Sequence, residues 1–203
     1  MPQRSPKISS RTAAKRKPNP KTNAKSIDAA MAVQEMGDVA SGAVFDSSGK
    51  FRYSLWRQWD NERPRLCFIM LNPSTADDAH NDPTIARCVS YARRWRFGSL
   101  EVVNAFAYRA TDPTKLARVR DPVGPLNDGY ILKAVRASAQ VVLAWGNHAL
   151  LDDRHAEVVD LLAERADIYC FGITKLGQPR HPLYVRNEAP LLPFTRQQVL
   201  QTE

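Results

Sequence analysis

The apolar run Leu66-Cys67-Phe68-Ile69-Met70-Leu71 passes directly into the polar segment Asn72-Pro73-Ser74-Thr75. A short continuous apolar run that ends at turn-forming residues is typical of a strand buried on both faces of a sheet. The pattern recurs three times, in runs that end at polar or turn-forming residues: 100–103 before Asn104, 141–145 before Gly146, and 168–171 before a loop ending Arg180-His181-Pro182. Four buried strands are therefore predicted, each followed by side chains able to carry chemistry.

Helical patterns separate these runs. Asp82-Pro83 is a typical helix start, with an N-cap followed by proline at the first helical position, and it predicts a helix to about residue 97. Further helices are expected after Asp112, from Pro125 or Asn127, and over 153–165. Alternating strands and helices predict an α/β fold, a single three-layer domain around a central four-stranded parallel sheet. Ligands of such sheets bind beyond the carboxyl ends of the strands, where the polar motifs fall.

The beginning of the chain differs in composition from the rest. Residues 1–27 contain eight Lys or Arg and no acidic residue, so they carry the whole formal net charge of +8. They also hold four prolines and few large apolar residues, which predicts a disordered basic arm attracted to nucleic acid or, alternatively, a solubilising extension. The α/β domain is expected over 28–203, with a possible short helix at 26–37, a β-hairpin at 42–59 and a core at 64–194.

Composition excludes several classes of protein. The chain has 203 residues, 43% of them hydrophobic and 25% charged, which suits one globular domain. No apolar run approaches the roughly 20 residues that span a bilayer. The three cysteines form no close pair, which favours the cytoplasm and gives no reason to expect a structural metal. No glycine-rich phosphate loop and no serine-nucleophile elbow occurs, and no cofactor is expected.

The strand-end asparagines are the first candidate site residues. Pro73 restricts the chain after Asn72, so the carboxamide of Asn72 is expected to project into the crevice in a fixed pose, where it can accept a hydrogen bond from water. Asn104 repeats this placement after the second run. The alternative is that Asn72-Pro73 only forms a turn, as most Asn-Pro pairs do.

The segment 175–184 is the second candidate, because it combines cations with a histidine between Arg180 and Pro182. Lys175 and Arg180 suit phosphate groups, whereas an isolated loop histidine is usually exposed and without function. A third, weaker candidate is the cluster of Asp77, Asp78, His80 and Asp82, whose side chains suit a divalent metal but whose spacing matches no established metal-binding loop.

Five motifs stand out along the chain: Leu71-Asn72-Pro73-Ser74-Thr75-Ala76-Asp77, Asn81-Asp82-Pro83-Thr84, Gly124-Pro125-Leu126-Asn127-Asp128, Ala144-Trp145-Gly146 and Gly177-Gln178-Pro179-Arg180-His181-Pro182-Leu183-Tyr184. Together they resemble an uncharacterised, mainly bacterial and phage family, domain-of-unknown-function family 1643, over about residues 43–194. This resemblance implies no particular activity.

A more distant resemblance is to the uracil-DNA glycosylase superfamily, and it implies roles for particular residues. Asn72-Pro73 is similar to the Asn-Pro turn whose asparagine positions the attacking water in the mismatch-specific branch, and Asn104 to the asparagine that reads the base edge. His181-Pro182 begins like the superfamily's last motif. The chain departs from the pattern at Asp77, which does not occupy the position of the water-activating aspartate, and in lacking a Phe or Tyr between Pro73 and Ile85 to serve as the stacking ring.

The resemblance implies hydrolysis of an N-glycosidic bond in DNA or a nucleotide, with a nucleic acid or nucleotide as partner. The alternatives are a non-catalytic nucleic-acid or modified-nucleotide binding protein, and a metal-assisted small-molecule hydrolase using Asp77. The expected site residues fall into three groups: catalytic Asn72, His181 and Asp77; substrate-binding Pro73, Ser74, Asn104, Trp145, Gly146 and Tyr184; and nucleic-acid-binding Lys175, Arg180, Arg186 and Leu183.

Overall fold

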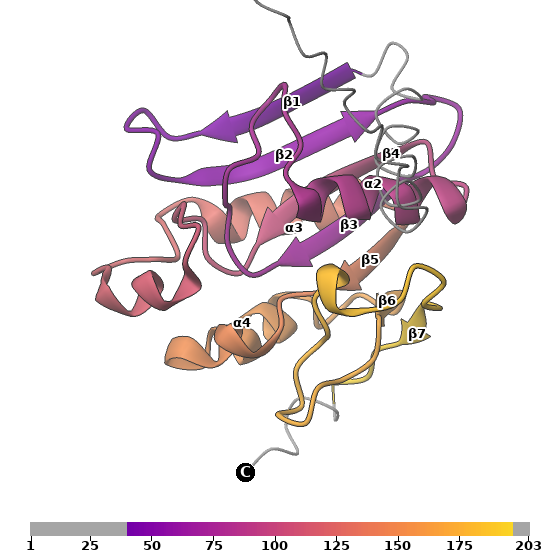
Figure 1. Cartoon of the computed structure of the whole chain (residues 1–203). Helices are drawn as coiled ribbons and strands as arrows, with labels where there is room; N and C mark the ends of the chain where they lie inside the picture. The colour runs from indigo at the N-terminus through magenta and orange to yellow at the C-terminus, as the bar shows by residue number, and fades with distance from the viewer. Residues whose placement is uncertain (1–39, 197–203) are drawn as a thin grey trace, which may run out of the picture. The chain divides into compact units, whose positions relative to one another are not determined.

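The computed structural model describes residues 40–196, and the predicted arm at 1–27 and the predicted helix at 26–37 lie outside this range (Figure 1). One seven-stranded sheet organises the described residues, in the order β1-β2-β4-β3-β5-β6-β7. Its strands are β1 (Ala40–Phe45), β2 (Arg52–Gln58), β3 (Arg65–Met70), β4 (Ser99–Asn104), β5 (Gln140–Leu143), β6 (Ile168–Cys170) and β7 (Leu192–Pro193).

The prediction of a four-stranded parallel sheet is wrong, because the sheet has seven strands and is mixed. The four predicted strands are β3, β4, β5 and β6, and they pair in parallel as the neighbours β4-β3-β5-β6. The predicted hairpin is present as β1 and β2, but β2 also pairs antiparallel with β4, and β7 pairs antiparallel with β6. These additions cover the strand edges that a four-stranded sheet would leave exposed.

Helices cover both faces of the sheet, as the alternation of side chains along β3 makes clear. Leu66, Phe68 and Met70 pack in one core with α2 (Pro83–Arg94), whereas Cys67 and Ile69 pack in a second core. That second core is completed by residues of α3 (Asn127–Arg136) and α4 (Arg154–Leu161). The domain therefore has three layers, with α2 on one face of the sheet and α3 and α4 on the other.

The helix starts follow the local sequence. The side chain of Asp82 accepts a hydrogen bond from the Ile85 backbone N–H at 2.9 Å and caps α2, with Pro83 at the first helical position as predicted. The short helix expected after Asp112 is present as a 3₁₀-helix, η1 (Pro113–Arg118). Two further 3₁₀ segments are η2 (Asn147–Asp153) and η3 (Pro182–Tyr184). Among the described residues, no helix has the length and apolar character needed to cross a membrane.

Candidate functional site

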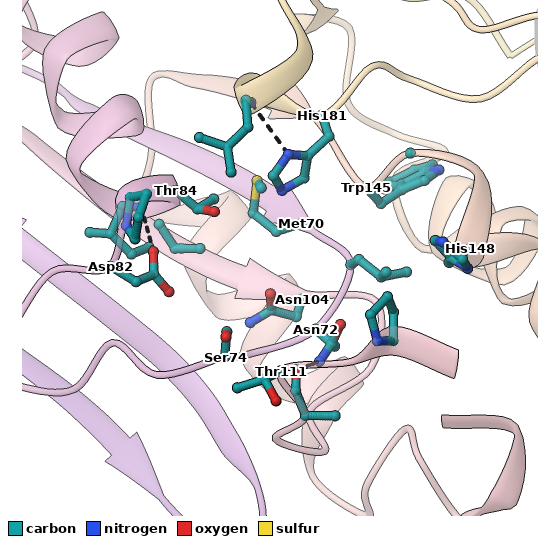
Figure 2. Close-up of a pocket in the computed structure, with 18 of the residues that line it drawn as sticks. Met70, Asn72, Ser74, Asp82, Thr84, Asn104, Thr111, Trp145, His148 and His181 are labelled. Atoms are coloured by element: carbon teal, nitrogen blue, oxygen red, sulfur yellow. Dashed lines mark hydrogen bonds between the residues drawn. The ribbon is translucent and has the colours of Figure 1, made fainter. Parts of the chain in front are cut away.

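A cavity of about 500 Å³ opens beyond the carboxyl ends of the parallel strands (Figure 2). Its lining includes the four strand-end or loop residues singled out by sequence: Asn72, Asn104, Trp145 and His181. The fold brings them together because the strands that precede them are parallel and end at one edge of the sheet. We refer to this cavity as the crevice.

The other expected site residues divide into two groups. Those that also line the crevice are Ser74, Gly146, Arg180, Leu183 and Tyr184. Those that do not line it are Pro73, Asp77, Lys175 and Arg186. Lys175 and Arg186 are exposed, and Pro73 is buried, where its carbonyl accepts hydrogen bonds from the Ala110 N–H and from Asn72.

The carboxamide of Asn72 is held in one orientation by the backbone. Its Nδ2 donates to the carbonyl oxygens of Pro73, at 3.0 Å, and Ala110, at 2.7 Å. Both amide hydrogens are thereby used, and the oxygen Oδ1 remains as the acceptor that the side chain offers to the crevice. An acceptor oxygen at a strand end is the group that the expected water-holding role would need.

Asn104 ends β4 and is only 1% exposed, yet its Nδ2 has no hydrogen-bond partner among the described residues. A buried amide donor without a partner costs about 1–3 kcal/mol. The side chain lines the crevice, so a ligand acceptor bound there would recover that cost.

His181 faces the crevice as a neutral imidazole. Its Nδ1 accepts a hydrogen bond from the Leu183 N–H at 3.3 Å and caps η3, which leaves the proton on Nε2. Burial lowers the pKa of His181 to about 4, and the negative charge of Asp82 opposes that shift. Figure 2 shows His181 on one side of the crevice and Asn72 and Asn104 on the other.

Trp145 and Gly146 connect β5 to the segment 172–181. The indole Nε1–H of Trp145 donates to Gln178 Oε1 at 2.9 Å, and the Gly146 N–H donates to the Pro179 carbonyl at 2.8 Å. Gly146 has φ +73° and ψ −167°, a conformation that is essentially restricted to glycine. The end of β5 therefore fixes the segment that carries His181.

Asp77 has a local role in the structure. Its carboxylate accepts from the backbone N–H groups of His80, at 2.6 Å, and Ala79, at 2.9 Å, and these bonds lower its pKa. Its backbone carbonyl accepts from Arg57 Nη2 at 2.7 Å. Within residues 40–196, no group of three or more His, Cys, Asp or Glu side chains is arranged to hold a metal ion.

Sequence reasoning missed two charged residues of the crevice, Arg52 and Asp82. The sequence marked Asp82 as a helix cap and as a member of a weak metal-binding cluster, but not as a residue that lines the crevice. Arg52 begins β2 and is 2% exposed, and burial lowers its pKa to about 10 although the charge of Asp82 opposes the shift. An arginine in a hairpin strand resembles a solvent-facing residue, so no sequence signal marked it.

Comparison with known proteins gives one match. The model of a family described as "Protein of unknown function (DUF1643)" matches residues 52–183, which is more than half of the chain. The matched region runs from the first residue of β2 into η3 and contains every residue named above as lining the crevice except Tyr184. Neither the curated proteins nor the solved structures provide a match to the chain.

Proposed function

The chain belongs to the DUF1643 family, and we propose that it hydrolyses an N-glycosidic bond in DNA or in a nucleotide. The observation that carries this proposal is the state of His181. Its Nδ1 is an acceptor and its pKa is about 4, so at neutral pH the ring is an uncharged donor whose Nε2–H is available to a ligand. A positioned neutral donor suits the stabilisation of negative charge that develops on a departing base.

Each of the three polar side chains then has a defined task. Asn72 Oδ1 accepts a hydrogen bond from the attacking water, His181 Nε2–H donates to the departing base, and Asn104 binds the edge of that base. The bond between the sugar C1′ and the base nitrogen breaks with its electron pair leaving on the base. The water oxygen bonds to C1′, and the proton that it loses ends on the base or in solvent. Asp77 has no part in this step, because its carboxylate is held in a turn outside the crevice.

The proposed partner is a nucleic acid or nucleotide, and the surface beside the crevice supports this choice. Arg180 lies in its wall, and Lys175 and Arg186 are exposed cations of the same part of the chain. Leu183 and Tyr184 are 44% and 81% exposed, so they are suitably placed to fill the gap that a flipped nucleotide leaves in a duplex. The net charge of residues 1–27 supports attraction to phosphates.

We also propose that the protein acts in the cytoplasm. Cys67, Cys88 and Cys170 are buried and unpaired, and burial raises the pKa of each thiol. Unpaired, unreactive cysteines suit a reducing compartment.

Base release tests the proposal directly. Oligonucleotides carrying uracil, mismatched bases or hypermodified bases, together with free nucleosides and nucleotides, are incubated with the protein, and free base is measured by chromatography. His181→Ala and Asn72→Ala should each lower turnover by roughly a hundredfold or more, while binding changes far less. His80→Ala, whose exposed ring lies outside the crevice, should behave as wild type. If the wild-type protein releases no base from any of these substrates, hydrolysis is ruled out.

Binding without chemistry is the second candidate, and the unpartnered donor of Asn104 favours it because that donor needs only a ligand. This function would show no base release and a large loss of affinity on Asn104→Ala. No observation on the described residues favours a metal-assisted hydrolase.

A further inference from the structure

Three arginines of the described domain are almost completely buried: Arg52, Arg57 and Arg154, with exposures of 1–2%. Arg57 Nε donates to Asn81 Oδ1, and Arg154 Nε donates to the Ala105 carbonyl. Arg52 is the exception, because its Nε has no partner among the described residues. Within residues 40–196, the hydrogen bond that its side chain makes runs from Nη1 to the Ala76 carbonyl, at 2.5 Å.

The charge of Arg52 is also uncompensated at close range. Arg154 pairs with Asp128 and Glu157, whereas no carboxylate of residues 40–196 lies within 4.0 Å of the Arg52 guanidinium. A buried cation without a partner is costly, and proteins retain one where something else supplies the missing charge.

Arg52 and Asn104 line the same crevice, and each has a buried donor that finds no partner in the part of the chain that the structure describes. The first residue of β2 and the last residue of β4 come close because the two strands are antiparallel neighbours; the Arg52 N–H donates to the Ala107 carbonyl at 3.0 Å. Two residues with unsatisfied donors in the wall of one cavity, one of them positively charged, describe a site for an acceptor group that carries negative charge.

We propose that Arg52 Nε and Asn104 Nδ2 bind an oxyanion of the ligand, a carboxylate or a phosphate group. The inference rests on the proposed function only in taking a base or nucleotide as the ligand. It adds that this base or nucleotide is charged, and it pairs Asn104 with Arg52, which no sequence motif marks. A carboxylate would lie on the base edge that Asn104 binds, whereas a phosphate would take the place of that edge.

The other charges of the crevice are compatible with an anion. Asp82 is the acidic residue of its wall, and one of its carboxylate oxygens already accepts from the Ile85 N–H at the start of α2. Arg180 adds a second cation to the wall, and His181 is neutral at neutral pH. A neutral ligand would leave the Arg52 charge desolvated, with only carboxylates beyond 4.0 Å, chiefly Asp82, to offset it, so it is the less favourable occupant.

Two ligand pairs that differ by one oxyanion test the proposal by isothermal titration calorimetry: uridine 5′-monophosphate against uridine, and 5-carboxyuracil against uracil. In at least one pair, the wild-type protein should bind the charged member about tenfold more tightly, the scale of one added charge-assisted hydrogen bond. The pair that shows the preference identifies whether the oxyanion is a phosphate or a base carboxylate. Equal affinity within both pairs, or no binding of either charged member, overturns the proposal.

Variants assign the preference to a residue. Arg52→Gln should abolish the preference, whereas Arg180→Gln, which removes the exposed cation of the same wall, should retain most of it. The opposite pattern overturns the proposal. If Arg52→Gln does not fold, Arg52→Lys replaces it: this variant keeps the charge but moves the donor, so it should weaken the preference for the charged ligand. The comparison of charged and neutral ligands on the wild-type protein needs neither variant.

The same samples are assayed for base release, which separates this inference from the proposed hydrolysis. A charge preference without base release supports the oxyanion site and rejects hydrolysis. Base release without a charge preference supports hydrolysis and rejects the oxyanion site.

Discussion

The indole Nε1–H of Trp145 donates to the side-chain oxygen of Gln178 at 2.9 Å, and both side chains are fully buried, at 1% and 0% exposure. This bond joins the end of β5 to the segment that follows β6, three residues before His181. The position of the crevice histidine therefore depends on a polar contact made inside the core.

Replacing Gln178 with Leu should lower the free energy of unfolding by about 1–3 kcal/mol, because it leaves the buried indole N–H without an acceptor. Trp145→Phe should also lower the free energy of unfolding, because it leaves the buried side-chain oxygen of Gln178 without its indole donor. Urea denaturation of both single variants and of the double variant gives the coupling free energy between Trp145 and Gln178. The double variant should lose less stability than the sum of the losses in the two single variants. Simple additivity would show that the bond contributes nothing of its own.

Asn104 and Asn127 form a matched pair of buried asparagines with opposite expected effects on stability. Asn127 Nδ2 donates to the carbonyls of Asn104 and Ala105, at 2.9 and 3.0 Å, whereas Asn104 Nδ2 has no partner within residues 40–196. Asn127→Leu should therefore destabilise the ligand-free protein by about 1–3 kcal/mol, while Asn104→Leu, which removes an amide that is buried without a partner, should leave stability unchanged or raise it. Thermal or urea denaturation measures both. A large loss for Asn104→Leu would mean that its amide has a structural partner.

His181 should make stability depend on pH. Its pKa is about 4 in the folded protein and about 6.5 when unfolded, so the unfolded chain binds the extra proton between these values. The melting temperature should consequently fall as the pH drops from about 6.5 to 4, and the contribution of His181 should be constant above this window. His181→Gln should make the fall shallower, and His80→Gln, at an 83% exposed side chain, is the control. An unchanged slope in His181→Gln would contradict the buried neutral imidazole.

Gly146 and Gly129 should respond differently to alanine. Gly146→Ala forces a Cβ onto a backbone with φ +73° and ψ −167°, which should cost about 1–3 kcal/mol although the nearest atom, His181 Cβ, is 3.8 Å away. Gly129 lies in α3 and a Cβ there meets nothing within 4 Å, so Gly129→Ala should stabilise by about 0.5–1 kcal/mol. Denaturation curves test the pair, and a neutral Gly146→Ala would show that the end of β5 adapts.

Residues 1–27 should control how DNA binding depends on salt. Deleting them removes the whole net charge, so affinity should fall and the plot of log affinity against log salt concentration should flatten. Fluorescence anisotropy at several salt concentrations measures the slope, and circular dichroism checks that the domain remains folded. An unchanged slope would exclude these residues from binding.

The sequence predicts the parallel strands well because each is a short, mostly apolar run that ends at polar or turn-forming residues. The start of α2 is equally predictable, because it is specified by two adjacent residues, the N-cap Asp82 and Pro83 at the first helical position. The pairing of β2 with β4 is not predictable in this way, because strand edges are matched by contacts between residues far apart in the chain. Arg52 was missed for the same reason: only the pairing reveals that its side chain is buried in the crevice wall. Asp77 has the composition of a catalytic acid, but its position in a turn depends on His80 and Ala79.

The antiparallel junction of β2 and β4 limits how far the domain can be shortened. A truncated chain that began near residue 64, where the parallel part of the sheet starts, would keep Asn72, Asn104 and His181 but lose Arg52. It would also expose the edge of β4, a row of unpaired backbone groups on which a second chain can pair and aggregate. The smallest portion with a complete crevice must therefore include β2, and the hairpin is as much a part of the ligand site as the loops beyond the parallel strands.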